Sequence, residues 1–160
     1  MTTRERIKEG TGLALRAALA VTFAWACFHK IADPRDFALQ VATYQILPLP
    51  LVNLQAIVLP WVELFAALLL ALGLFTRPAA LVTCGMNVMF IAAISMALAA
   101  HLHLQCGCFA SSSAGEEMNA WLIVRDALLL LAGAYLTAAA PGRLSLDRVL
   151  EKRRRDGKTR

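Results

Sequence analysis

Four long apolar runs determine what this chain can fold into. They cover approximately residues 12–30, 51–75, 79–100 and 121–140. Each run is near the ~20 residues that an α-helix needs to cross the hydrocarbon core of a bilayer. Only 17% of the 160 residues are charged, whereas a soluble domain carries about 25%. We therefore predict an all-α fold, a four-helix transmembrane bundle over residues 1–142 followed by a basic cytoplasmic tail over residues 143–160.

The first run could also be the core of a secretory signal peptide. Basic residues precede it, and Ala24-Trp25-Ala26 resembles a small-residue cleavage site. The run is longer than the core of a usual signal peptide, which favours a helix that stays in the protein. Both possibilities give the later runs the same sidedness.

A shorter helix is predicted in the connector between the first two runs. Asp33-Pro34 is a helix-start signal, because proline is well tolerated at the first helical position. Apolar side chains then recur at helical spacing, at Phe37, Val41 and Tyr44. Such a stripe suits a helix that lies along the membrane surface, and Pro48 and Pro50 end it. We therefore expect a short interfacial helix between the first and second spans.

The distribution of Lys and Arg predicts which ends of the spans face the cytoplasm. The net charge is +5, and most of the 16 basic residues lie in the N-terminal segment, at Arg77 in the central turn and in the tail. Residues 101–120 contain no Lys or Arg. By the positive-inside rule both termini should be cytoplasmic, and the 101–120 loop should lie outside. The same rule and the attraction of anionic lipids explain the basic tail, so nucleic-acid binding is disfavoured.

Within that loop, Cys106-Gly107-Cys108 is the candidate reactive site. Gly107 has no Cβ and reaches backbone conformations that other residues avoid, so the two sulfurs can approach each other. A disulfide that closes so small a ring should be strained, and a strained, exposed disulfide is easily reduced and exchanged. Disulfides form and persist outside the cytoplasm but rarely inside it. The pair is therefore predicted to cycle between dithiol and disulfide.

The same loop offers a second chemistry. His101 and His103, with Cys106 and Cys108, form the pattern His-x-His-x2-Cys-x-Cys, and all four side chains are ligands that Zn or Cu(I) accepts. Against this, the close spacing of the ligands constrains the coordination geometry, and histidines at the end of a span could simply lie at the interface. We assign no metal in the primary prediction and keep this site as the alternative.

Two ionisable residues inside the spans are further candidates. Glu63 lies near mid-bilayer, where an ionised carboxylate is costly unless it is paired, protonated or reached by water. As a functional residue it would be a proton relay or, beside Trp61, part of a quinone site. As a structural residue it would tie its helix to Arg125 or Lys30. Arg125, near the outer end of the fourth span, could favour the thiolate of a loop cysteine or only anchor its helix.

Two other cysteines lie inside the predicted spans. Cys27 and Cys84 should be buried in apolar surroundings, where thiols are unreactive. They lie near opposite membrane faces, so they should not pair with each other. Cys27 is on the outer side, where it could act as a resolving thiol.

Several short motifs follow one another along the chain. They are Phe28-His29-Lys30-Ile31-Ala32-Asp33-Pro34 with Phe37 and Tyr44 through Pro48, Leu59-Pro60-Trp61-Val62-Glu63-Leu64, Thr76-Arg77, Cys106-Gly107-Cys108-Phe109 and Arg125-Asp126. In this order they resemble the bacterial MauE/DoxX-type redox-associated membrane proteins, from the first span to the fourth. One departure is Ala110, where the family pattern leads us to expect glycine.

The resemblance implies a four-helix bundle in the bacterial inner membrane that takes part in redox chemistry. Methylamine-utilisation members of the family are implicated, beside a thioredoxin-like partner, in maturing the disulfide-rich small subunit of methylamine dehydrogenase. Other relatives accompany sulfur-compound:quinone oxidoreductases. The resemblance therefore implies a periplasmic partner and a redox role, and it leaves the substrate open.

Two functions from different classes follow from these observations. The leading hypothesis is a membrane thiol–disulfide component, and so a candidate oxidoreductase. In it, Cys106 and Cys108 exchange disulfides with a periplasmic thioredoxin-like protein or a disulfide-containing client. Arg125 and Glu63 are its supporting site residues, and quinone near Glu63 and Trp61 is its conjectural cofactor. The second hypothesis is a non-catalytic membrane subunit or assembly factor, whose loop docks a partner or binds Cu or Zn.

Overall fold

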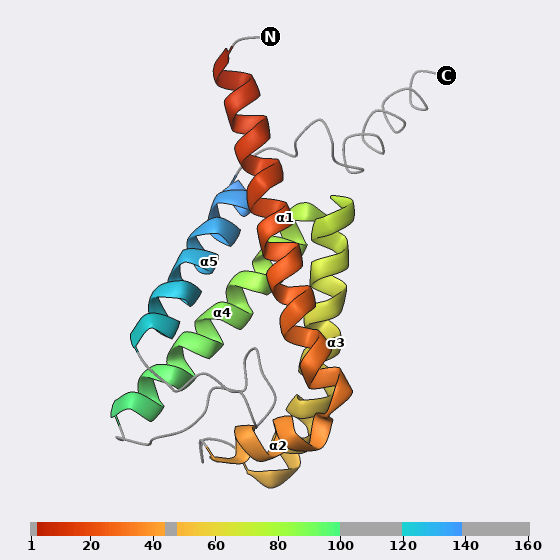
Figure 1. Cartoon of the computed structure of the whole chain (residues 1–160), viewed down its shortest axis with the longest axis vertical. Helices are drawn as coiled ribbons and strands as arrows, with labels where there is room; N and C mark the ends of the chain where they lie inside the picture. The colour runs from red at the N-terminus through yellow and green to blue at the C-terminus, as the bar shows by residue number, and fades with distance from the viewer. Residues whose placement is uncertain (1–2, 44–47, 100–119, 139–160) are drawn as a thin grey trace.

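The computed structural model describes residues 3–43, 48–99 and 120–138, and nearly all of them are helical (Figure 1). The five helices are α1 (Thr3–Ala32), α2 (Pro34–Thr43), α3 (Leu49–Leu72), α4 (Thr76–Ala99) and α5 (Ala120–Ala138). No strand occurs in these three segments. The predicted all-α fold and the extra helix between the first two spans are both confirmed.

Within the described residues, four helices are long and apolar enough to cross a membrane. Their spanning segments are Glu9–Ala32, Leu49–Leu72, Thr76–Met96 and Trp121–Ala138. With 10 residues, α2 is too short to cross a bilayer. The chain is therefore a multi-pass membrane protein, with one non-spanning helix between its first two spans.

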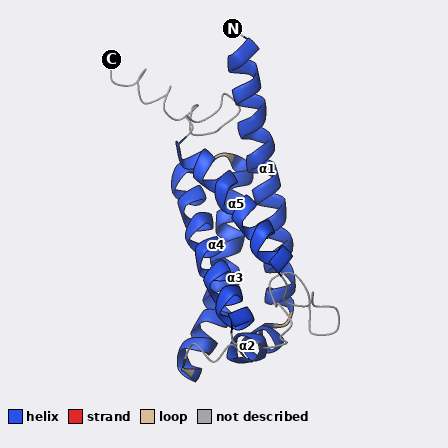
Figure 2. Ribbon diagram, turned by 90° about the vertical axis from the view of Figure 1, so that its left-hand side faces the viewer, coloured by secondary structure: helices blue, strands red, loops and turns tan. Residues whose placement is uncertain are grey.

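The spanning helices alternate in direction. The start of α1, the turn between α3 and α4, and the end of α5 lie at one end of the bundle, which we call the turn end (Figure 1). The opposite end, called the α2 end, holds α2, the end of α4 and the start of α5. Figure 2 shows the same arrangement after a quarter turn. The last residue of α4, Ala99, and the first residue of α5, Ala120, therefore both lie at the α2 end.

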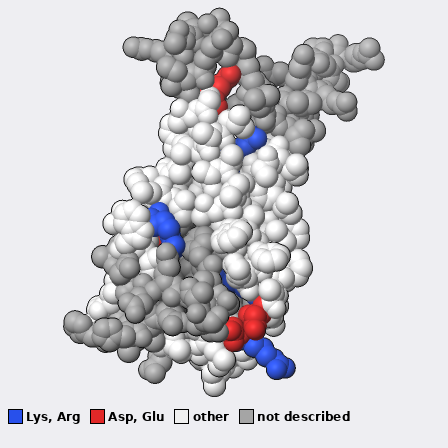
Figure 3. Space-filling view, in the orientation of Figure 1, with Lys and Arg blue, Asp and Glu red and all other residues white. Residues whose placement is uncertain are grey.

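The helices pack as two pairs around an apolar core. α1 packs chiefly on α3 and α4 on α5, and contacts between α3 and α4 and between α1 and α5 join the pairs. The core includes Leu19, Phe23, Leu59, Leu70, Met86 and Leu136. Many large apolar side chains face outward, and charged atoms form only small patches on the face shown in Figure 3. A surface of this kind is suited to lipid contact.

The turn between α3 and α4 explains why α3, the second spanning helix, ends at Leu72 and not at the predicted residue 75. Gly73 has a φ of 65° and caps α3, and the N–H of Leu74 donates to the carbonyl of Leu69 at 3.0 Å. This left-handed cap closes the last turn of the helix, and glycine adopts it without steric cost. Apolar composition continues through the turn, so hydropathy alone does not reveal it.

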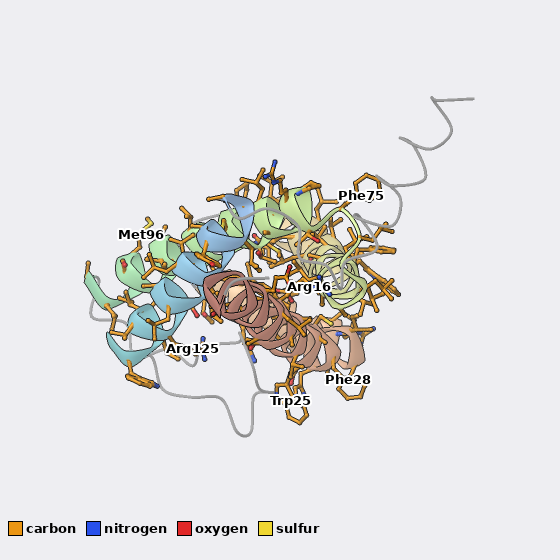
Figure 4. The ribbon with its side chains drawn as sticks, turned by 90° about the horizontal axis from the view of Figure 1, so that it is seen from above. Arg16, Trp25, Phe28, Phe75, Met96 and Arg125 are labelled. Atoms are coloured by element: carbon orange, nitrogen blue, oxygen red, sulfur yellow. The ribbon has the colours of Figure 1, made fainter. Side chains whose placement is uncertain are left out.

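Arg16 of α1 fills the space that a side chain at Gly73 would occupy. A Cβ built on Gly73 would lie 2.5–2.8 Å from three guanidinium atoms of Arg16. Arg16 is buried, and Figure 4 shows it between α1 and the α3–α4 turn. The guanidinium thus lies beside the C-terminal end of α3, where a cation is favoured by the helix dipole.

The short helix α2 begins where the sequence predicts. Pro34 is its first residue, and Oδ1 of Asp33 accepts a hydrogen bond from the backbone N–H of Asp36 at 3.1 Å. This is an N-cap, which satisfies one of the donors at the start of the helix. Phe37 is buried, so α2 packs its apolar side onto the spanning helices.

Candidate functional site

A buried ion pair joins α1 to α3. Nζ of Lys30 lies 2.6 Å from Oε1 of Glu63 and donates a hydrogen bond to it. The Glu63 side chain has no exposed surface, and only 2% of the Lys30 side chain is exposed. The sequence suggested Lys30 or Arg125 as the residue that links Glu63 to another helix. The structure places Lys30 beside Glu63.

Two aromatic rings lie close to the Lys30 ammonium. Nζ lies 5.2 Å from the ring centroid of Phe37 on α2 and 5.0 Å from that of Phe90 on α4. Both distances fall within the ~6 Å range of cation–π attraction. Lys30 is therefore in contact with residues of three other helices, and one side chain connects α1, α2, α3 and α4.

The ion pair joins the middle part of α3, at Glu63, to the last turn of α1, at Lys30. Glu63 precedes the α3 cap at Gly73 by ten residues, about 15 Å along the axis at 1.5 Å per residue. It follows Leu49, the first residue of α3, by about 21 Å on the same scale. Glu63 is therefore far from both ends of α3, and its depth in a bilayer stays a prediction.

A second pair of charged side chains lies on α5. Nε of Arg125 donates to Oδ1 of Asp126 at 3.1 Å, although the two residues are neighbours in sequence. Asp126 is buried, whereas 24% of the Arg125 side chain is exposed. The buried carboxyl groups of α3 and α5 thus each have their own cation, Lys30 for Glu63 and Arg125 for Asp126.

The sequence reasoning missed Asp126 as a site residue. In the sequence, Asp126 stands out only as the neighbour of Arg125, pointing about 100° away from it on the helix. The available signal was the same one that identified Glu63: an acidic residue inside an apolar span is rare and should have a partner. The same rule, applied to every acidic residue in the four spans, identifies Asp126 as well.

Two free thiols lie within the described helices. Sγ of Cys27 donates to the carbonyl of Ala24 at 3.1 Å, and Sγ of Cys84 lies 3.8 Å from the carbonyl of Leu130. Cys27 is buried about one helical turn before Lys30. The two side chains therefore lie on the same face of α1.

Trp61 lies on a different face of α3 from Glu63. Half of Trp61 is exposed on the outer surface (50%), while Glu63 has no exposed surface. Residues two apart on a helix point about 200° apart, which accounts for the difference. The structure therefore does not bring Trp61 and Glu63 together on one face of α3. Trp25 and Phe28 on α1 likewise project outward (Figure 4).

The loop residues of the sequence-based site lie outside the described part of the chain. This applies to Cys106 and Cys108, and to His101 and His103 of the alternative metal site. Within residues 3–43, 48–99 and 120–138, no group of three or more His, Cys, Asp or Glu could hold a metal ion. The thiol and metal predictions for the loop therefore remain predictions.

Comparison with known proteins identifies the family. Residues 8–139 match the family described as "Methylamine utilisation protein MauE". This segment contains all four spanning helices apart from residues 3–7 at the start of α1. The chain belongs to the MauE family.

Two relatives illustrate the similarity. One is the "Methylamine utilization protein MauE" of Paracoccus denitrificans, 31% identical over an alignment of 138 residues that covers 82% of this chain and 73% of the relative. The other is the protein of the same name from Methylophilus methylotrophus, 31% identical over 123 residues, which are 76% of this chain and 64% of the relative. No solved structure matches the chain. The MauE resemblance seen in the sequence is thus confirmed.

Proposed function

We propose that this MauE-family protein is the membrane component of a thiol–disulfide exchange system, with Cys106 and Cys108 as its reactive pair. Its partner would be a periplasmic thioredoxin-like protein or a disulfide-containing client. Two curated relatives are named for methylamine utilisation, and we propose the same process for this chain. The system would operate in the bacterial inner membrane.

One observation supports this proposal more than any other. The two cysteines lie in the sequence between α4 and α5, and the α4 and α5 ends that flank them are both at the α2 end (Figure 1). Arg77, which is exposed in the first turn of α4, lies at the opposite, turn end. The basic N-terminal segment begins at the turn end as well. If the positive-inside rule assigns the turn end to the cytoplasm, the opposite end faces the oxidising compartment.

The exchange step would follow ordinary thiol–disulfide chemistry. A thiolate of Cys106 or Cys108 attacks a disulfide sulfur of the partner, so a mixed disulfide forms and one partner thiolate leaves. The second cysteine, as thiolate, attacks the mixed disulfide and releases the other partner sulfur. Two electrons pass from this chain's dithiol to the partner, whose two thiolates take up the two protons. The reverse sequence reduces this chain and oxidises the partner.

Arg125 is the described residue that supports this chemistry most directly. It lies in the second turn of α5, close to the helix start that follows the cysteine-bearing segment. A partly exposed guanidinium at this end would favour a nearby thiolate. The exchange itself needs no quinone, and we propose no quinone step through Trp61 and Glu63, which face different sides of α3.

Mixed-disulfide trapping tests the proposal. Cys106→Ser and Cys108→Ser are expressed separately, and cells are quenched with acid and an alkylating reagent before non-reducing electrophoresis. We expect at least one variant to accumulate a partner-linked species that a reductant releases. The control is Cys84→Ser, which changes a thiol inside α4 and should trap nothing.

The same experiment distinguishes thiol exchange from the second hypothesis. A non-catalytic subunit or assembly factor should give no mixed disulfide in any variant, and that result would refute thiol exchange. If the loop instead binds Zn or Cu through His101, His103, Cys106 and Cys108, purified protein should contain the metal, and replacing both histidines with alanine should remove it. A membrane-impermeant thiol reagent that fails to reach the loop from outside would refute the proposed orientation.

A further inference from the structure

The hydrogen bond between Arg125 and Asp126 joins two side chains that a helix does not direct toward each other. Successive residues of a helix point about 100° apart, so sequence neighbours do not face each other. Nε of Arg125 nevertheless donates to Oδ1 of Asp126 at 3.1 Å. The Arg125 side chain must therefore bend round the surface of α5 toward Asp126, instead of extending directly away from its own Cα.

Asp126 is the fixed member of this pair. Only 3% of its side chain is exposed, compared with 24% for Arg125, and Leu122, one helical turn earlier, is also buried. A short side chain in such surroundings has little freedom, whereas a long arginine side chain has several rotatable bonds and near a helix end can reach interfacial water. The carboxylate therefore determines where the guanidinium lies.

A contact through Nε also fixes the direction of the whole guanidinium. This group is planar, and its five N–H donors have a rigid geometry. The hydrogen bond to Oδ1 of Asp126 thus determines where the two terminal nitrogens of Arg125 point. A functional side chain that is held in this way by a second, buried residue keeps the geometry that its chemistry requires.

The position of Arg125 along α5 allows it to meet the cysteines. It follows Ala120, the first residue of α5, by about 7.5 Å at 1.5 Å per residue. Residues 109–119, eleven in number, separate Cys108 from Ala120, and a chain of that length spans at most about 36–40 Å. Chain length therefore permits Cys106 or Cys108 to lie beside the guanidinium.

We propose that Asp126 is a positioning residue for thiol–disulfide exchange. Its carboxylate holds Nε of Arg125, and the guanidinium so placed stabilises the thiolate of Cys106 or Cys108. This inference rests on the proposed function, in which the cysteines react as thiolates. It adds that Asp126 acts through its hydrogen bond and not through its charge, because a negative charge close to a thiol disfavours the thiolate.

Two substitutions separate the hydrogen bond from the charge. Asp126→Asn removes the negative charge and keeps an oxygen that can accept from Nε, whereas Asp126→Leu has a similar branched shape and removes both. The reduced full-length protein is placed in lipid nanodiscs with a metal chelator, and each loop thiol is followed alone, in Cys106→Ser or Cys108→Ser. The rate of alkylation by a membrane-impermeant reagent, measured against pH, gives the pKa of that thiol, because the thiolate is the reacting form.

The two substitutions should have different effects. We expect Asp126→Leu to slow alkylation near neutral pH by about three- to tenfold, because the pKa of the thiol rises, and Arg125→Gln should do the same. Asp126→Asn should not slow it. Adding Asp126→Leu to Arg125→Gln should have no further effect, since both changes remove the same interaction. The control is Thr137→Ala, which removes a side-chain hydrogen bond at the turn end of α5 and should leave the pH profile unchanged.

Other outcomes would overturn the inference. If the Asn and Leu variants accelerate alkylation equally, Asp126 acts through its charge. If neither variant changes the rate, or if Arg125→Gln leaves it unchanged, Asp126 does not position a group that acts on the thiols. Should Asp126→Leu fail to fold, Asp126→Glu keeps the charge but displaces the acceptor, and it should slow alkylation as well. Alkylation needs no partner protein, so a missing mixed disulfide would refute thiol exchange without altering these rates.

Discussion

Gly133 on α5 should tolerate almost no additional volume. A Cβ built on it would lie 2.7 Å from Sγ of Cys84 on α4, and 3.5 Å from both Oγ1 of Thr83 and the carbonyl oxygen of Ala80. Favourable non-bonded contacts lie at about 3.5–4.0 Å. Gly133→Ala therefore forces Cys84 from its position or separates the two helices by roughly 1 Å, measured against that contact distance.

We expect Gly133→Ala to destabilise the folded protein by about 1–3 kcal/mol, the usual range for overpacking. The structure also predicts a specific rescue. Cys84→Ala removes only the sulfur, so the nearest atoms to the new methyl group are then those at 3.5 Å, an ordinary contact. The double variant Gly133→Ala/Cys84→Ala should therefore be clearly more stable than Gly133→Ala.

Reversible unfolding in mixed micelles, followed by circular dichroism as the fraction of denaturing detergent rises, measures these differences. The control is Gly85→Ala on α4, where no atom lies within 4 Å of the added Cβ. That change should be neutral or slightly stabilising, because alanine is the better helix former. Equal stability of the Gly133 and Gly85 variants, or a failure of Cys84→Ala to rescue, would refute the proposed close contact of α4 and α5.

Three further predictions concern the other buried contacts. Gly73→Ala should destabilise the protein by at least about 1–2 kcal/mol, because the new residue must adopt a left-handed conformation and displace Arg16; a stability equal to that of the natural protein would contradict this packing. Lys30→Met should lower the free energy of unfolding by about 3–5 kcal/mol, because it leaves Glu63 buried without its ion pair. The double variant Lys30→Met/Glu63→Leu should recover most of that stability in the same unfolding assay, and strictly additive effects would show that the pair is not coupled. Asp33→Ala should weaken α2 locally by about 1 kcal/mol, seen as faster amide hydrogen exchange in α2 only, whereas unchanged exchange there would exclude the capping role.

Much of the fold could be predicted because lipid imposes simple requirements on a sequence. Apolar length identified the four spans, and Asp33-Pro34 located the start of α2 correctly. The α3–α4 boundary was less accurate, since α3 ends at Leu72 and α4 begins at Thr76. The residues of that turn are themselves apolar, so the break comes from backbone conformation at Gly73 and not from a change in polarity.

The candidate site was only partly predictable, for a related reason. The position of Glu63 along the sequence showed that it needs a partner, but the choice between Lys30 and Arg125 depends on which helices pack together. α3 packs on α1, and the outward and inward faces of spanning helices are both apolar, so the sequence pattern does not reveal this. The separation of Trp61 from Glu63, in contrast, follows from helix geometry alone.

The contact between Arg16 and Gly73 has a consequence for how the protein is made. Arg16 is synthesised before Gly73, and its place in the folded protein is formed by the C-terminal end of α3. We therefore expect α1 to reach its final packing only after α3 has entered the membrane.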